Sequence, residues 1–406
     1  MGGPVHAQGH AGGHGEGAAR RCPPVRAGPR VQIGHGEGAD PDRVPGRRRV
    51  QGVLGQGRAH PGRGGEAHRQ GRGQVGVRID LHTHVVPEGW EDWAARFGGA
   101  PWPRLVRKDA CRATIMTGDT FFRDIDDRSW SPARRIEDMD RLGIDRQALS
   151  PPPVMFCYWA DARANAAFAR LQNENVAAVA ARHPARFVGM ATVPLQDTDL
   201  AVKELRHCRE RLGLRAVEIG SCPAGRDFDD PVLFAFFEAC ADLDVAVFVH
   251  PASPLVGQDR LTKYYFPLIV GNPLETALAI SKLIFGGVLE RLPALRLCFA
   301  HGGGAFPFTL ARLDHGWKVR PEGPAAIPRP PREYARRLYF DSLTLSAANL
   351  RFIVEQFGAD RVVIGSDYPF DMGSDDPVAA LAEANLPTAA IAQIEGIAAT
   401  RFLGPA

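Results

Sequence analysis

The chain has 406 residues, of which 45% are hydrophobic and 23% are charged, with a formal net charge of +3. This composition is typical of a globular protein that is long enough to bury a large core. No stretch approaches the ~18 uninterrupted apolar residues of a membrane span and no signal segment opens the chain, so we expect a cytoplasmic protein without membrane contact.

The cysteines exclude two further classes of protein. There are seven of them, an odd number, scattered along the chain without Cys-x-x-Cys spacing. Neither a disulfide framework nor a cysteine zinc site fits that distribution. We therefore expect buried thiols.

The first 78 residues differ from the rest of the chain. They contain thirteen arginines, no lysine, five acids and 21 of the 44 glycines. They have no apolar periodicity, and no aromatic residues alternate with the arginines as base stacking would require. We predict that residues 1–77 are a disordered Gly/Arg-rich extension that binds no nucleic acid. An alternative interpretation is a wrongly extended start, with the natural protein beginning near Val77.

From residue 78 onward, short apolar runs alternate with longer amphipathic stretches. Most runs are β-branched or almost continuously apolar, as in strands buried on both faces of a parallel sheet. The predicted strands are Arg78–His84, Arg146–Ser150, Phe187–Pro194, Ala216–Ser221, Val245–Pro251, Leu295–Gly302, Leu338–Leu343 and Val362–Pro369.

Helical patterns follow these strands, and several begin with proline in the first turn. The predicted helices are Pro132–Leu142, Ala162–Arg182, Asp199–Leu212, Pro231–Leu243, Pro273–Leu292, Phe306–Trp317, Ser346–Phe357 and Pro377–Ile397. Eight strand–helix units predict an α/β fold, a (β/α)₈ TIM barrel over residues 78–406. A doubly wound open sheet is the alternative.

The connection 85–131 after the first strand is much longer than the others and is rich in aromatic residues, glycine and proline. Active sites of barrels are built at the C-terminal ends of the strands. We therefore predict a long functional insertion at this point.

Four histidines and one aspartate stand at the C-terminal ends of four predicted strands: His82, His84, His250, His301 and Asp367. Alone, a histidine at a strand end is usually a hydrogen-bonded core residue. Together, on the catalytic face of one barrel, these residues predict a metal site. Imidazole and carboxylate suit zinc, with manganese as the alternative. No lysine ends a strand, so we predict a single divalent ion without a bridging carboxylated lysine.

Several segments resemble the decarboxylase branch of the metal-dependent amidohydrolase superfamily. The matching segments are Ile79–His84, Pro153–Phe156, Phe248–Pro251, Ala300–Phe308 and Gly365–Phe370. The resemblance as a whole covers nearly all of residues 78–404. The His-Gly-Gly-Gly and Ser-Asp-Tyr-Pro-Phe segments are its most specific part.

The resemblance implies a role for each of the strand-end residues. His82, His84, His250 and Asp367 would be the metal ligands, and His301 would be the catalytic general base and acid. A near-neutral pKa suits that proton transfer. A fifth ligand or a structural histidine is the alternative for His301.

Three more residues match positions that contact substrate in that family. Arg123 would bind a carboxylate of a small-molecule substrate, and Phe370 would form a pocket wall. Arg312 would reach into the site of a neighbouring subunit, which implies a homodimer. Surface arginines and ordinary core packing are the alternatives. Asp80 is interpreted as supporting the site without binding the metal.

The sequence departs from the family pattern beside the predicted site. Pro251-Ala252-Ser253 stands where the family has Pro-Trp-Asp, and Phe266-Pro267-Leu268 stands where it has Leu-Pro-Trp. Asp119 and Thr120 stand near the position of a family lysine. These differences change the size and polarity of the pocket while leaving the metal residues unchanged.

The resemblance implies an oxygen-independent decarboxylase of an unsaturated or aromatic carboxylic acid. The first expected substrate is 2-amino-3-carboxymuconate-6-semialdehyde, from tryptophan–kynurenine or nitrobenzoate breakdown. Alternatives are a hydroxybenzoate decarboxylase of the resorcylate type, a metal-dependent hydrolase or hydratase, and a barrel that binds without catalysis.

Overall fold

A computed structural model describes residues 76–98, 101–252 and 256–405. The predicted disorder of residues 1–77, and the alternative of a wrongly extended start, concern a segment that lies outside the described residues except for its last two positions. The first strand, β1, begins at Ile79.

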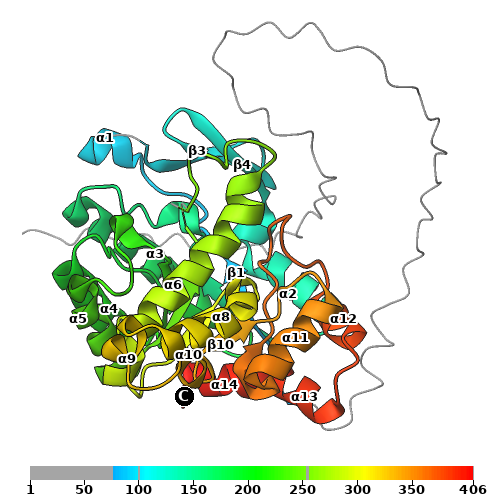
Figure 1. Cartoon of the computed structure of the whole chain (residues 1–406). Coiled ribbons are helices and arrows are strands. Elements are labelled where there is room, and N and C mark those ends of the chain that lie inside the picture. The colour runs from blue at the N-terminus through cyan, green and yellow to red at the C-terminus, as the bar shows by residue number, and fades with distance from the viewer. Residues whose placement is uncertain (1–75, 99–100, 253–255, 406) are drawn as a thin grey trace, which may run out of the picture. The chain divides into compact units, whose positions relative to one another are not determined.

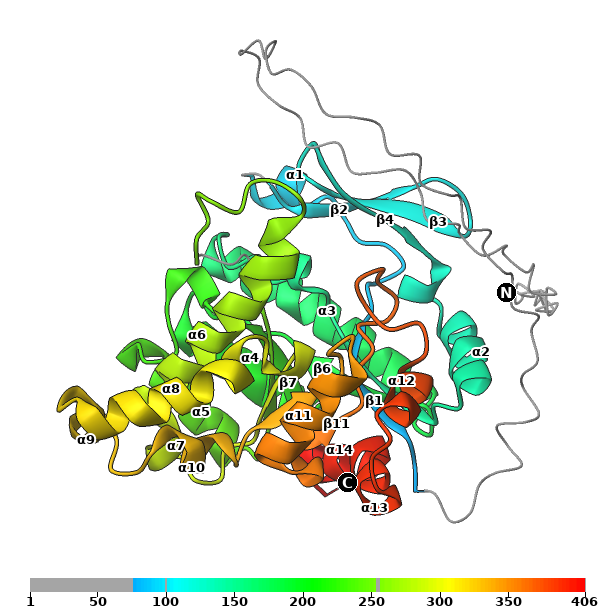
Figure 2. The same cartoon turned by 45° about the vertical axis from the view of Figure 1, so that its right-hand side comes forward.

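Eight parallel strands form one sheet, in the order in which they occur along the chain. They are β1 (Ile79–His84), β5 (Arg146–Ser150), β6 (Phe187–Ala191), β7 (Ala216–Gly220), β8 (Ala246–His250), β9 (Leu297–Phe299), β10 (Tyr339–Asp341) and β11 (Val362–Val363). The sheet closes because the segment that includes and follows β11 pairs with β1, through the hydrogen bonds Leu81 N to Ile364 O and His84 N to Tyr368 O. The predicted barrel is therefore confirmed, and Figures 1 and 2 show the helices around it.

Alternate residues of the strands face two different apolar layers. In β8, Val247 and Val249 belong to the large cluster that includes the surrounding helices, whereas Ala246 and Phe248 pack inside the barrel. Burying a side chain such as Phe248 contributes about 1.5–3 kcal/mol. His250 continues the inward-facing series at the strand end, because residues two apart share a face.

The helices lie outside the strands, and their ends carry ordinary capping signals. Ser131 caps α2 and Asp161 caps α3 through their side chains, and Gly143 ends α2 in the left-handed conformation. The main helices are α2 (Pro132–Leu142), α3 (Ala162–Arg182), α4 (Thr198–Glu210), α5 (Pro231–Asp242), α6 (Asn272–Phe285), α8 (Phe306–Val319), α11 (Ala347–Phe357), α12 (Pro377–Glu383), α13 (Thr388–Ala392) and α14 (Ala398–Leu403). Shorter helices are α7 (Val288–Arg291), α9 (Glu322–Ala326) and α10 (Pro331–Ala335).

Two predicted helices are interrupted. The stretch predicted over Pro273–Leu292 divides into α6 and α7 at Gly287, whose φ of 71° ends the first helix. The stretch predicted over Pro377–Ile397 divides into α12, α13 and a π turn (Gln393–Ile397), because Asn385 is left-handed and Pro387 cannot continue a helix. Apolar periodicity alone did not reveal these breaks.

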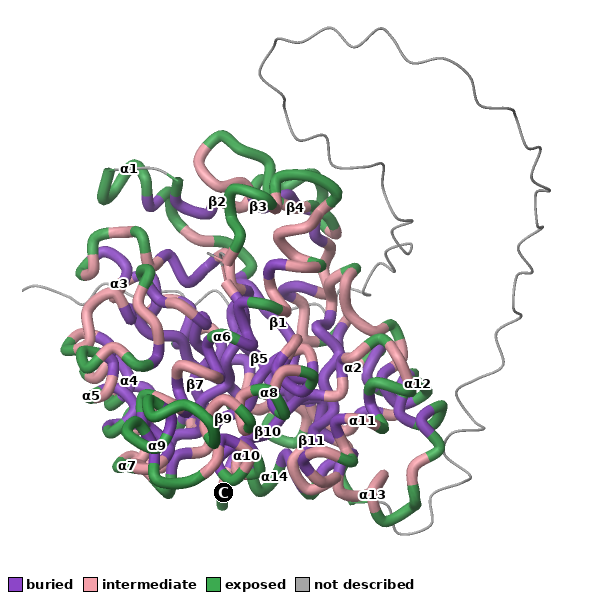
Figure 3. The backbone as a smooth tube through the Cα atoms, viewed as in Figure 1, coloured by how far each residue is buried: buried purple, intermediate pink, exposed green. Residues whose placement is uncertain are grey.

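The end of the barrel opposite the strand C-termini is closed by α14. Its residues Ala398, Ala399 and Phe402 pack with Leu81 and other side chains from inside the barrel. In Figure 3 the buried colouring is concentrated on the barrel strands in the middle of the fold.

The insertion after β1 has secondary structure of its own, which the sequence prediction did not include. It contains α1 (Trp93–Phe97) and an antiparallel sheet of β2 (Pro103–Arg107), β3 (Arg112–Thr117) and β4 (Thr120–Asp126). Ala113 and Ile115 of β3 are buried beneath this sheet. Gly118 has the positive φ that the two-residue turn between β3 and β4 requires.

One helical segment of the described chain, Pro267–Phe285, is long and apolar enough to cross a membrane by length and composition alone. It joins a π turn (Pro267–Gly271) to α6, and 44% of it is buried inside the fold. Core helices of globular proteins pass the same test, and α6 supplies Ile280, Leu283 and Ile284 to the core.

Candidate metal centre

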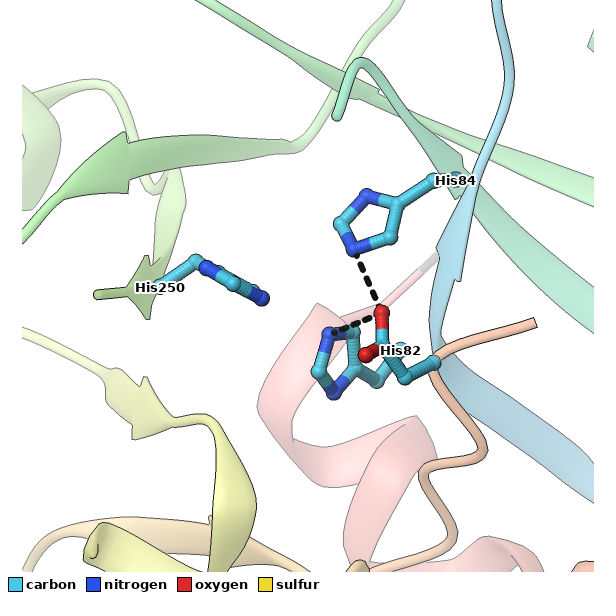
Figure 4. A group of neighbouring side chains, drawn as sticks. His82, His84 and His250 are labelled. Carbon is cyan, nitrogen blue, oxygen red and sulfur yellow. Dashed lines mark ion pairs between the residues drawn. The ribbon is translucent and has the colours of Figure 1, made fainter. Parts of the chain in front are cut away.

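Four of the predicted residues meet at the C-terminal end of the barrel. His82 and His84 lie at the end of β1, His250 ends β8, and Asp367 follows β11. One potential ligand atom from each lies within 4.8 Å of the other three. Figure 4 shows the three histidine rings pointing toward a common centre.

The ligand atoms of this cluster are buried and incompletely satisfied. The Nε2 atoms of His82, His84 and His250 and the Oδ1 atom of Asp367 have no hydrogen-bond partner among the described residues. Asp367 Oδ1 lies 3.0 Å from His84 Nε2 and 3.5 Å from His82 Nε2. Buried polar atoms are normally paired. This donor set therefore fits a divalent cation that would satisfy all four atoms at once.

The opposite nitrogens of the histidine rings face acceptors. His82 Nδ1 lies 2.6 Å from Asp341 Oδ2 at the end of β10, and His250 Nδ1 lies 2.7 Å from the Pro251 carbonyl. His84 Nδ1 lies 3.9 Å from Oε2 of Glu218, the middle residue of β7. The two short contacts hold the rings of His82 and His250 with Nε2 toward the metal position. Sequence reasoning singled out neither Asp341 nor Glu218, although each is an acid within a predicted strand.

The protonation states also suit a metal. Burial, together with the charges of His301 and His82, holds the pKa of His250 well below its usual range. Burial would raise the pKa of Asp367, but contacts with His301 and His84 keep that pKa well below its ordinary value. A neutral imidazole and an ionised carboxylate are the forms that bind cations.

His301 lies beside the four ligand atoms without being one of them. Its Nε2 is 3.9 Å from Asp367 Oδ2, and its ring centre is 5.0 Å from that of His250. Burial alone would lower the pKa of His301, but Asp367 and Asp341 raise it. The ring lines the cavity in front of the cluster, where it could exchange a proton with a bound molecule.

The backbone around His301 is unusual. His301 and the three glycines that follow all have positive φ, from 56° to 79°. A Cβ atom at Gly304 would lie 2.5 Å from the Pro273 carbonyl oxygen, so only glycine fits there. The glycine run lets this turn pack against the start of α6 and fixes the direction of the histidine.

A cavity of about 1190 Å³ opens in front of the cluster. His84, His250, His301 and Asp367 line its inner end. Its outer part is lined by large apolar side chains that are themselves exposed, and these are Phe122, Trp159, Ile269, Phe308 and Leu345.

Arg123 and Phe370 both line this cavity. A β-bulge lies here in β4, because Ile115 pairs with Arg123 and the next residue, Met116, pairs with Phe121. The extra residue lets Phe122 and Arg123, although consecutive, both face the cavity. The Arg123 guanidinium lies 4.6 Å from the Phe370 ring centre. The ring of Phe370 in turn lies 5.3 Å from that of His84.

Arg312 lies apart from these residues. It is exposed on α8 and does not line the metal cavity of its own chain. It belongs instead to a separate groove of about 620 Å³ between α6 and α8, with Leu278 and Trp317.

Asp80 does not join the ligand cluster. Its carboxylate accepts hydrogen bonds from the backbone N–H and hydroxyl of Ser366. Burial raises the pKa of Asp80 to about 7. This contact fixes the start of the turn that carries Asp367, which agrees with a supporting role.

Comparison with known proteins places these features in context. A family model described as amidohydrolase matches residues 79–404. A 2-amino-3-carboxymuconate-6-semialdehyde decarboxylase from Dictyostelium discoideum is 44% identical over 298 residues, which cover 73% of this chain and 83% of that protein. A gamma-resorcylate decarboxylase from Polaromonas sp. is 31% identical and covers 72% of this chain and 88% of that protein.

The fold is also that of a solved enzyme. The crystal structure of a dihydroxybenzoic acid decarboxylase from Polaromonas sp., with bound manganese and the inhibitor 2-nitroresorcinol, superposes with a TM-score of 0.66 at 24% identity. The match covers 80% of this chain and 96% of that one.

Proposed function

This chain belongs to the amidohydrolase family, and from that membership we propose that it is a metal-dependent decarboxylase that acts on an unsaturated or aromatic carboxylic acid without oxygen. The matched relatives described above are named decarboxylases. The observation that carries the proposal is the buried set of four unsatisfied ligand atoms, with His301 beside it at the inner end of a cavity.

The substrate we propose first is 2-amino-3-carboxymuconate-6-semialdehyde. The Dictyostelium relative named for that substrate is 44% identical to this chain, compared with 31% for the resorcylate relative. A hydroxybenzoate is the second candidate, because resorcylate and dihydroxybenzoate decarboxylases share the fold and most of the chain length.

The cofactor we propose is one divalent ion held by His82, His84, His250 and Asp367. Zinc suits three imidazoles and one carboxylate, and manganese is the alternative because the Polaromonas structure contains it. Once bound, the ion supplies Lewis-acid stabilisation of the negative charge that develops as CO₂ leaves.

The chain's own residues position the substrate and supply the proton. Arg123 binds a substrate carboxylate through its planar N–H groups, and Phe370 packs against that guanidinium and against His84. When the carbon–carbon bond breaks, its electrons stay on the substrate carbon, and His301 Nε2 delivers the proton that replaces CO₂ there. The reaction needs no oxidant, because no atom other than the proton is added.

The homodimer stays a prediction, as does the cytoplasmic location. Arg312 lies outside the cavity of its own chain, so it can contribute to catalysis only through a neighbouring subunit. Sedimentation of the full chain and of Arg312→Ala tests whether a dimer forms and whether the variant keeps it. An activity assay of the same two proteins then tests whether loss of this side chain lowers activity while the dimer remains.

The experiment that tests the function uses the full chain, stripped of metal and reloaded with Zn²⁺ or Mn²⁺. Freshly generated 2-amino-3-carboxymuconate-6-semialdehyde is followed by its absorbance, and 2,6-dihydroxybenzoate by CO₂ release. We expect metal-dependent decay of the first, lost in His301→Asn. CO₂ from the second compound alone would reassign the substrate, and ring opening without CO₂ would indicate a hydrolase. A folded, metal-loaded protein inactive in all these assays would refute decarboxylation.

A further inference from the structure

Arg123 is held by residues from two other parts of the chain. Its Nη2 donates to the Tyr265 hydroxyl at 3.0 Å, and its Nη1 donates to Asp371 Oδ1 at 3.1 Å. Phe370 covers one face of the guanidinium. The Tyr265 hydrogen bond and the Phe370 ring together fix the plane of the group as well as its position.

Of the two hydrogen bonds, that to Tyr265 is the better protected. The Asp371 side chain is 83% exposed, so water competes with it and screens its charge. Tyr265 is half-buried in the connection between β8 and α6, where it contacts Arg123 of the β2–β3–β4 sheet. Figure 2 shows the segment that leads into α6 rising toward that sheet.

The backbone of this connection turns sharply to present the hydroxyl. Tyr264 and Tyr265 have φ values of 59° and 61°, a left-handed conformation that is uncommon for two successive aromatic residues. Only the second tyrosine contacts Arg123. The first is 76% exposed and has no hydrogen-bond partner in the part of the chain that the structure describes.

The remaining donors of Arg123 are available to a ligand. A guanidinium has five N–H groups, and the two hydrogen bonds above use two of them. The other three have no partner among the described residues, and the group lines the cavity. Tyr265 itself does not line the cavity, so any effect that it has on a ligand passes through Arg123.

We propose that Tyr265 is a positioning residue that sets the orientation of Arg123 and so determines the affinity of the cavity for carboxylates. The inference rests on the proposed carboxylate-binding role of Arg123. It adds a residue from a different connection, 142 positions away in sequence. Loss of one hydrogen bond of this kind typically costs about threefold to tenfold in an equilibrium constant.

The test compares Tyr265→Phe with Tyr264→Phe, a matched control that removes the neighbouring hydroxyl. Calorimetric titration of the metal-loaded full chain measures the Kd of benzoate and of benzamide, its uncharged analogue. We expect Tyr265→Phe to weaken benzoate binding about threefold to tenfold and to leave benzamide unchanged. Tyr264→Phe should change neither. With an active substrate, Tyr265→Phe should raise KM and keep kcat within about twofold.

The outcomes separate this inference from the proposed function. Unchanged benzoate affinity in Tyr265→Phe, or equal weakening of both ligands, would overturn the positioning role. If Arg123→Met also left benzoate binding unchanged, the proposed role of Arg123 would fall with it. If the binding differences appear but no substrate is decarboxylated, Tyr265 keeps its role and the proposed activity fails.

Discussion

At its inner end the cavity is walled by residues that the barrel strands hold in place, whereas at its mouth it is walled by residues from the connections between strands. His84 and His250 are buried at strand ends, and the rings of His82 and His250 have acceptors behind them. Phe122 and Leu345 at the mouth are exposed apolar residues. Figure 3 shows the same contrast between the buried strands and the more exposed β2–β3–β4 sheet.

The two regions have different tasks: the inner end holds the metal, and the mouth contacts the substrate. A metal site tolerates little displacement of its ligands, so it is built on elements whose positions the core determines. Substrate contacts can vary with the connections while the chemistry is retained. The departures at Ala252 and Leu268, which both line the cavity, fall in the connection after β8 and not among the metal residues. Substitutions at the inner end should therefore abolish activity, and those at the mouth should change affinity.

The largest effect is expected at the inner end. His82→Ala removes one of four ligands and leaves the buried Oδ2 atom of Asp341 without its histidine contact. We expect metal content near zero and a loss of activity of roughly 10³-fold or more. Metal analysis after dialysis, with kinetics at saturating Zn²⁺, measures both. Full metal occupancy in this variant would remove His82 from the ligand set.

A smaller loss is expected one contact further out. Asp341→Asn keeps the shape of the side chain but weakens the acceptor for His82 Nδ1. Metal affinity should fall about 10- to 100-fold, while activity recovers at saturating metal. Chelator competition gives the affinity, with Asp360→Asn at the surface as the control. If Asp341→Asn retained full affinity, the ring of His82 would not depend on this carboxylate.

Cys222 lines the cavity, and the pH dependence of its alkylation tests how far burial shifts the pKa of its thiol. Burial, aided by the charges of Glu275 and Asp227, raises the pKa of Cys222 to about 11. Because the thiol stays protonated below that pKa, alkylation by iodoacetamide should rise about tenfold per pH unit between pH 8 and 10. At pH 8 alkylation should be about 20-fold slower than in the urea-unfolded chain, because the much smaller thiolate fraction is partly offset by the greater nucleophilicity of a thiolate of higher pKa. Mass spectrometry follows the adduct, and equal rates in both states would contradict the raised pKa.

The smallest effect is expected at the exposed edge of the mouth. Asp371→Asn removes a carboxylate that competes with the substrate for Arg123. Because the pair is exposed, benzoate affinity should rise only about twofold. Asp375→Asn is the control, since Asp375 has no ion pair among the described residues. Weaker benzoate binding in Asp371→Asn would show that this carboxylate helps to orient Arg123.

The residues that the sequence predicted and those that it missed differ in a physical way. His250 was predictable because strand periodicity locates the end of β8, and in a barrel such ends converge. Asp367 was predicted at the end of a longer strand, Val362–Pro369, whereas β11 ends at Val363 and Asp367 lies in the turn that follows. Asp341 was missed because an acid at a strand end carries no sign of the histidine that it contacts from 259 positions away.

The mouth was less predictable. The six-residue strand Arg112–Thr117 is too short for its alternation to stand out within an aromatic, glycine-rich connection. The contact between Arg123 and Tyr265 joins two connections, and no periodicity relates residues in such segments. The location of Arg312 on the outside of α8 likewise followed from helix packing that the sequence does not display.

The closure of the barrel by α14 has a consequence for the order of events in a reaction. Because Phe402 and its neighbours fill the far end, the described residues leave the cavity open on the side of the mouth. Reactant, CO₂ and the decarboxylated product would then share one route, and a bound product would block the next reactant. The decarboxylated product should therefore inhibit competitively against the reactant.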